Sequence, residues 1–207
     1  MKKYDFKKHI GSVHITPKVK KYVLIMCIGV FLNEFLSTII VPLDLPLWLD
    51  MSGTALVAIV LEPAAGIIVA FIDNFYLSVF RFDASSVIYL ALGASMAVIT
   101  GIRLRNKKQF TFKNIFITWA LVIIVTSLLS GIITLWRTGG ISDLDWERHF
   151  YYVARDAGAS NWLACFFGAF AVKVPDISVS GLCVALSYIL LPKKLKEKEE
   201  DETSLKP

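Results

Sequence analysis

Seven runs of apolar residues, separated by short polar or basic stretches, dominate the pattern of the chain. The runs cover residues 22–41, 48–61, 64–80, 86–102, 115–136, 157–173 and 176–191. Several approach the roughly 20 apolar residues that a helix needs to cross a bilayer, and isolated Gly and Pro breaks are typical of helices rather than barrel strands. The pattern therefore predicts an all-α integral membrane protein.

The basic residues indicate how this predicted bundle is oriented. Seven of the 22 Lys and Arg lie in residues 1–21, five lie in 103–113 and five follow Pro192. Cytoplasmic loops carry an excess of Lys and Arg, so we place all three segments in the cytoplasm. An even number of crossings follows, which predicts a bundle of about six transmembrane helices with cytoplasmic N- and C-termini. Seven crossings would leave the basic tail outside.

Seven apolar runs exceed six crossings, so one run must behave differently. We expect residues 157–173 to enter the outer leaflet and return, or to pack across the top of the bundle. The last span is then 176–191, and Pro175-Asp176 should start it, with the Asp side chain capping its free amides. The chain divides into a basic N-terminal segment (1–21), a transmembrane bundle (22–192) and a charged tail (193–207).

Composition excludes several classes of protein. Of the 207 residues, 56% are apolar and only 19% are charged, which is too apolar for a soluble domain. The length leaves no room for a fused ATPase or kinase. The net charge of +5 does not indicate nucleic-acid binding, because the basic blocks alternate with apolar runs.

Polar side chains gather at the outer ends of the first four predicted spans and in the 137–162 segment. Ionisable groups in a membrane cost several kcal/mol unless they face protein or water, so we predict a substrate pocket that opens outward. The alternative is that Asp50 and Asp83 cap helices at the interface. Candidate substrate-binding residues are Asn33, Glu34, Asp50, Thr54, Asp73, Asn74, Tyr89, Asn161 and Trp162.

Aromatic residues offer stacking surfaces for a polar heterocycle in this pocket. Tyr89, Trp136 and Trp162 are the candidates, and both tryptophans fit equally well as interfacial anchors. Residues 137–156 are expected to form a lid with a flexible start at Gly139-Gly140. The alternative for this segment is an amphipathic stretch that rests on the membrane.

Four aromatic and two basic residues characterise the predicted lid. Trp146, Phe150, Tyr151 and Tyr152 can cover a ligand. Arg148 and Arg155 are expected to pair with a substrate anion, or with Asp50 or Asp83, when the lid closes.

Small residues repeat every four positions on the fourth predicted span. Gly93, Ala97 and Gly101 create a face that lets another helix approach closely, and we consider it a candidate partner interface. Packing within the protein explains the same spacing.

Several motifs recur in an order that resembles a transporter family. Residues 45–54 read LPLWLDMSGT; Ala58, EPAAG at 62–66 and Asp73-Asn74 follow. Gly93, Gly101, PDI at 175–177 and Leu191-Pro192 continue the pattern. Together they resemble the substrate-binding (S) subunits of energy-coupling factor (ECF) transporters over most of residues 22–193. Glu62 departs from the usual Gly before Pro, and the first span lacks the Ala-x-x-x-Ala face with which many such subunits dock.

This resemblance implies a six-helix protein of the prokaryotic plasma membrane that captures a vitamin or related small micronutrient from outside. It also implies a transmembrane coupling (T) protein, two ABC-type ATPase subunits as partners, and toppling in the bilayer to release substrate. The chain has no GxxxxGK[ST] phosphate loop, so energy must come from such partners. Lys2 stands where nickel and cobalt relatives carry Met-His, so we expect neither a metal substrate nor a cofactor.

Two other classes of function compete with an importer subunit. An enzyme is disfavoured because HExxH, GxSxG and a carboxylate cluster of the spacing found in membrane lipid synthases are missing from the sequence. A membrane sensory module with an outward-facing ligand pocket remains the alternative. Such a module needs a cytoplasmic output domain, whereas this chain ends in a short charged tail.

Overall fold

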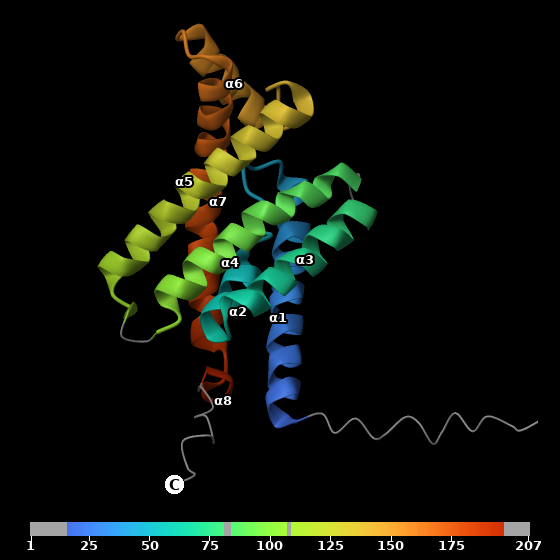
Figure 1. Cartoon of the computed structure of the whole chain (residues 1–207), viewed down its shortest axis with the longest axis vertical. Helices are drawn as coiled ribbons and strands as arrows, with labels where there is room; N and C mark the ends of the chain where they lie inside the picture. The colour runs from blue at the N-terminus through green and yellow to red at the C-terminus, as the bar shows by residue number, and fades with distance from the viewer. Residues whose placement is uncertain (1–15, 81–83, 107–108, 197–207) are drawn as a thin grey trace, which may run out of the picture.

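The computed structural model describes residues 16–80, 84–106 and 109–196, and this part of the chain is all-helical (Figure 1). Five of its helices are long and apolar enough to cross a membrane, as expected for a multi-pass membrane protein. Asp83 lies outside the described residues. The elements are α1 (Pro17–Ile40), η2 (Val41–Leu43), α2 (Ser52–Val60), α3 (Pro63–Phe80), η3 (Ala84–Tyr89), α4 (Leu90–Leu104), α5 (Phe112–Thr138), α6 (Asp145–Asp156), α7 (Asn161–Leu190) and α8 (Lys193–Lys196).

Helix α2 is only nine residues long, about 14 Å at 1.5 Å per residue, and it begins beside the middle of α1. The Asn33 amide donates to Thr54 Oγ1 at 3.1 Å and accepts from the Gly53 N–H at 2.6 Å. A Cβ at Gly53 would overlap the carbonyl of Gly29. The 44–51 loop therefore returns alongside α1 before α2 starts, and the two helices run antiparallel.

The prediction of a separate segment at 157–173 is wrong. Residues 161–190 form the single helix α7, and Pro175 lies inside it. Proline removes one helical hydrogen bond, but membrane helices tolerate it where neighbours surround the helix, and α7 packs against α5, α6 and α2. Asp176 consequently does not cap a helix N-terminus.

The described parts of the three basic segments lie at one end of the bundle, hereafter the basic end. The start of α1, the α4–α5 connection and α8 lie there in Figure 1. Leu195 packs against the apolar cluster that contains Ile25, and Phe110 stacks on Tyr188 with ring centroids 5.3 Å apart. Contacts between distant parts of the chain thus bring together the charges that the sequence separates.

The small residues of α4 face inward, so the prediction that they form a partner interface is wrong. A Cβ added to Gly93 would lie 2.8 Å from Ala70 Cβ, and one added to Gly101 would lie 2.7 Å from Pro63 Cγ. Ala97 is fully buried against Gly66. The spacing allows α3, α2 and α4 to pack closely within the protein.

Candidate functional site

A cavity of about 350 Å³ lies at the other end of the bundle, hereafter the cavity end. It is bounded by the 44–51 loop, α3, α4, α5, α6 and α7. Apolar side chains such as Met51, Leu77 and Leu92 form part of its wall. The polar and aromatic side chains that line it are Trp48, Asp50, Asn74, Tyr89, Ser130, Thr134, Arg137, Thr138, Ser142, Asp143, Glu147 and Lys173.

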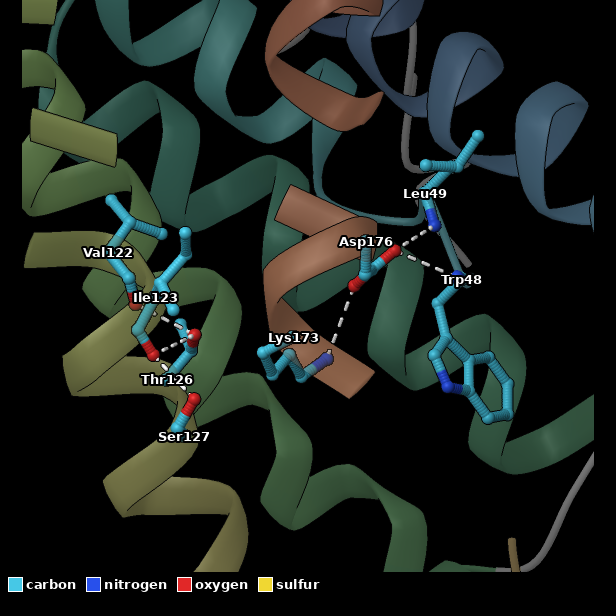
Figure 2. Close-up of polar contacts among 8 residues, drawn as sticks. All are labelled: Trp48, Leu49, Val122, Ile123, Thr126, Ser127, Lys173 and Asp176. Carbon is cyan, nitrogen blue, oxygen red and sulfur yellow. Dashed lines mark hydrogen bonds and ion pairs between the residues drawn. The ribbon is translucent and has the colours of Figure 1, made fainter. Parts of the chain in front are cut away.

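One carboxylate of α7 holds the 44–51 loop in place (Figure 2). Asp176 Oδ1 accepts the backbone N–H of Trp48 at 2.8 Å and that of Leu49 at 3.0 Å. Leu49 has a φ of 55°, a left-handed conformation that is a genuine outlier for a bulky residue. The two hydrogen bonds therefore stabilise a strained turn that α2 follows directly.

The other oxygen of Asp176 forms a buried ion pair. Asp176 Oδ2 lies 3.4 Å from Lys173 Nζ, and the two residues are 0% and 7% exposed. Their spacing of three positions places both on one face of α7. Figure 2 shows the lysine side chain directed toward the carboxylate. Because Lys173 lines the cavity, the ion pair links the backbone of the 44–51 loop to the cavity wall.

The loop anchored in this way contributes Trp48, Asp50 and Met51 to the cavity wall. Asp50 Oδ1 is inaccessible to solvent and has no hydrogen-bond partner among the described residues. Asp50 lies within electrostatic range of Lys173, Asp176 and Glu34. The cavity wall thus includes a carboxylate group, one oxygen of which receives no hydrogen bond from the described residues.

A second carboxylate enters the cavity from α6. Glu147 is 5% exposed and accepts hydrogen bonds from Ser142 Oγ at 3.0 Å and Thr134 Oγ1 at 3.3 Å. Burial raises the pKa of this carboxyl above its usual value, while the two hydrogen bonds and the nearby Lys173 act in the opposite direction. Glu147 therefore joins α6, the α5–α6 connection and α5 around the cavity.

The predicted binding residues separate into two groups. Asp50, Asn74 and Tyr89 are among the residues that line the cavity, and so is Gly93, which was predicted to face a partner. The others are not among its lining residues. Asn33 and Thr54 instead bond to each other where α1 meets α2, and Asp73 is buried on α3, one position from Asn74. Glu34 lies on α1 beside Asn33.

Asn161, Trp162 and Trp136 lie near the cavity end but outside the cavity. Asn161 accepts from the Tyr151 hydroxyl at 2.6 Å and donates to the Gly139 carbonyl at 3.0 Å, so it connects α6, α5 and α7. Trp162 is 46% exposed and stacks on Phe166. Trp136 is 75% exposed. These three side chains therefore do not form a surface on which a ligand in the cavity could stack.

Sequence reasoning missed five of the charged or aromatic lining residues, namely Trp48, Arg137, Asp143, Glu147 and Lys173. A signal for Lys173 was available, because it is the one basic residue between 157 and 191, and Asp176 is the one acidic residue there. Ionisable residues inside an apolar run are functional candidates by default. Reading Pro175-Asp176 as a helix start concealed that signal.

The 137–156 segment, which was predicted to form a lid, lies against the cavity. Arg137, Ser142 and Asp143 line the cavity, as does Glu147 on α6. Gly139 ends α5 in a left-handed conformation, with φ 71° and its N–H bonded to the Leu135 carbonyl at 3.1 Å. The glycine pair thus forms a helix cap, and closure of the segment as a lid stays a prediction.

Arg148 and Arg155, the two arginines expected to pair on closure of the lid, have other partners than Asp50 in this structure. Arg148 pairs with Asp145, and Arg155 donates to the Ala159 carbonyl at 2.8 Å. Trp146 makes the contact with the loop instead, because its Nε1–H donates to the Asp44 carbonyl at 3.0 Å. In this structure Arg148 and Arg155 therefore bond within and beside α6, and the pairing expected on closure of the lid stays a prediction.

No family model matches the chain, and neither a curated protein nor a solved structure is significantly similar to it. Within the described ranges, no three His, Cys, Asp or Glu side chains are grouped so that they could hold a metal ion. The chemistry of the site follows from the cavity, whose polar and aromatic walls can bind a small organic molecule.

Proposed function

We propose that this chain is the substrate-binding (S) subunit of an ECF-type ABC importer, which captures a vitamin or related small organic micronutrient and delivers it without converting it. The observation that carries the proposal is the presence of a polar cavity at one end of the bundle. The cavity is built from five helices and a loop, and it combines ionisable groups with aromatic and apolar walls. Polar groups of this kind are costly in a membrane protein unless they serve a ligand or a water-filled cavity.

The position of the basic residues supports an outward-facing cavity. The described Lys and Arg of the start of α1, the α4–α5 connection and α8 lie at the end of the bundle opposite the cavity, and Lys and Arg are enriched on the cytoplasmic side of membrane proteins. In this orientation both termini lie in the cytoplasm of a prokaryotic cell. The 44–51 loop and α2 together complete one crossing, so that the five long helices and this composite segment make six.

An importer of this design needs partners that supply energy. We propose a transmembrane coupling (T) protein and two ABC-type ATPase subunits. Because the small residues of α4 are buried, docking must use other surfaces. The alternative, a membrane sensory module with an outward-facing pocket, has the same cavity but different partners.

Co-purification from the native membrane distinguishes these two functions. The tagged chain, extracted in a mild detergent, should retain a T protein and two ABC ATPase subunits, identified by mass spectrometry. An unrelated multi-pass protein with the same tag is the control for non-specific recovery. A kinase or adaptor in place of the ATPases would establish the sensory alternative and contradict the importer proposal.

The ligand can be sought in the same preparation. Mass spectrometry should detect a small molecule that co-purifies with the wild type and is lost from Asn74→Ala, since Asn74 lines the cavity. Asn114→Ala is the matched control, because Asn114 bonds Arg103 near the basic end. Equal recovery from both variants would contradict the placement of the site. Reconstituted alone, the chain should bind this molecule without ATP-driven accumulation.

A further inference from the structure

The buried charges around the cavity do not balance. Three carboxylates, those of Asp50, Glu147 and Asp176, lie within electrostatic range of the single ammonium group of Lys173. They come from the 44–51 loop, α6 and α7. At the rim, Arg137 and the exposed Asp143 carry one charge of each sign. The interior of the site therefore carries an excess of negative charge when its acids are ionised.

The hydrogen bonds show where this excess is left without a partner. Asp176 receives two backbone N–H groups and the ammonium of Lys173. Glu147 receives two hydroxyl groups. Asp50 Oδ1 receives no hydrogen bond from the described residues, although it is buried. A buried carboxylate oxygen without a donor is costly, and a ligand that supplies a donor or a positive charge lowers that cost.

We propose that the cavity selects a planar organic cation, such as an amidinium or a protonated amino-heterocycle, whose N–H groups bind Asp50. This inference rests on the proposed function in one respect only, namely that the bound cation is the transported substrate. Trp48 and Tyr89 line the same cavity, and aromatic faces attract cations as well as planar rings. The volume of about 350 Å³ suits a molecule of one or two rings.

An anionic ligand in the interior of the cavity would have to bind Lys173, because Arg137, the other cationic residue of the wall, is only half-buried. The contacts of Lys173 oppose this arrangement. Its Nζ already faces Asp176 Oδ2 at 3.4 Å. An incoming anion would also meet the field of Asp50 and Glu147, because both interact with Lys173. Like charges repel at such a site, so the selectivity should favour cations.

Three probes of nearly equal size and shape test this inference: benzamidine, benzamide and benzoate. Binding to the detergent-solubilised full chain is measured by calorimetry and by the shift in thermal unfolding. We expect benzamidine to bind about ten-fold more tightly than either other probe, as a charge-assisted hydrogen bond predicts. Benzoate that binds as tightly as benzamidine, or no binding of benzamidine at millimolar concentration, would overturn the proposal.

Substitutions assign the selectivity to one residue. Asp50→Asn should weaken benzamidine binding about ten-fold, whereas Asp156→Asn, an exposed acid at the end of α6, should change nothing. Asp50→Glu keeps the charge and should retain the preference for benzamidine, which separates loss of charge from loss of folding. Unchanged affinity in Asp50→Asn overturns the inference. Recovery of ATPase subunits does not depend on ligand charge, so it tests the importer proposal independently.

Discussion

The cavity end and the basic end of the bundle are held together by different contacts. At the cavity end, the links between elements are polar: Asp176 bonds the 44–51 loop, Glu147 bonds Thr134 and Ser142, and Trp146 bonds Asp44. Toward the basic end, α2, α3 and α4 meet through Gly66, Gly101 and small alanine side chains. The contacts around the cavity are thus hydrogen bonds, whereas α2, α3 and α4 meet by close packing; the hydrogen bonds near the basic end, such as that from Arg103 to Asn114, join α4 to α5.

The kind of contact in each region determines whether that region can bind a ligand. Close packing of small residues satisfies van der Waals contacts and leaves no polar group for a ligand. Eight of the nine residues of α2 are buried, and none of them is ionisable. The polar joints of the cavity end, by contrast, enclose groups with unused hydrogen-bonding capacity, and hydrogen bonds can be exchanged when a ligand enters. Function is therefore expected where the joints are polar.

Removal of the Asp176 carboxylate should have the largest effect. Asp176→Ala leaves Lys173 and two backbone amides without their partner, and breaking a buried ion pair in this way costs about 3–5 kcal/mol. Thermal unfolding in detergent measures the loss, and hydrogen exchange should rise in residues 44–51. Asp176→Asn retains an acceptor and should lose less. An unchanged exchange rate in the loop would show that Asp176 does not anchor it.

A larger residue at Gly66 should disrupt the close packing among α2, α3 and α4. A Cβ at this position would lie 2.8 Å from Ala58 Cβ and 2.9 Å from Ala97 Cβ, so Gly66→Leu should destabilise the fold by about 1–3 kcal/mol through overpacking. The matched control is Ala64→Leu, because Ala64 is exposed two positions earlier on the same helix. Equal melting temperatures for the two variants would contradict the close packing of α2, α3 and α4.

The pH dependence of stability should distinguish the two ends further. Burial raises the pKa of Glu147, so the folded protein holds this proton more tightly than the unfolded chain does. The free energy of unfolding should therefore gain from this group as pH falls through the folded pKa toward the unfolded one. In Glu147→Gln, the melting temperature should rise less as pH falls between the folded and the unfolded pKa of Glu147, because the titrating group is gone. An identical pH profile in the variant would exclude Glu147 as its source.

The link between α6 and the loop should give the smallest effect. Trp146→Phe removes the hydrogen bond to the Asp44 carbonyl but keeps an aromatic ring, and a single bond of this kind contributes about 0.5–1.5 kcal/mol. Exchange in residues 44–47 should rise slightly. Trp162→Phe is the control, because Trp162 stacks on Phe166 outside the cavity. A larger change in the control would contradict this assignment.

Hydropathy alone was sufficient to predict the helical class and the apolar segments. The predicted runs at 22–41, 64–80 and 115–136 correspond to α1, α3 and α5 within a few residues. The candidate site was predicted in part, since Asp50, Asn74 and Tyr89 line the cavity. These three were found because polar residues stand out against apolar runs. Successive spans cross the membrane in opposite directions, so polar residues at the end of one span and the start of the next were placed at the same depth.

Only the tertiary structure decided which neighbour each of these residues meets. Asn33 and Asn74 are both asparagines in apolar helices, yet one bonds Gly53 and Thr54 while the other faces the cavity. Gly93 and Gly101 were equally suited to an external partner, yet they pack against α3. Transfer from water into lipid and transfer into a protein interior favour the same residues, so the sequence determined the helices of this protein. Shape and hydrogen-bond complementarity between helices distant in sequence determined the faces that pack, the continuity of α7 and the cluster around Lys173.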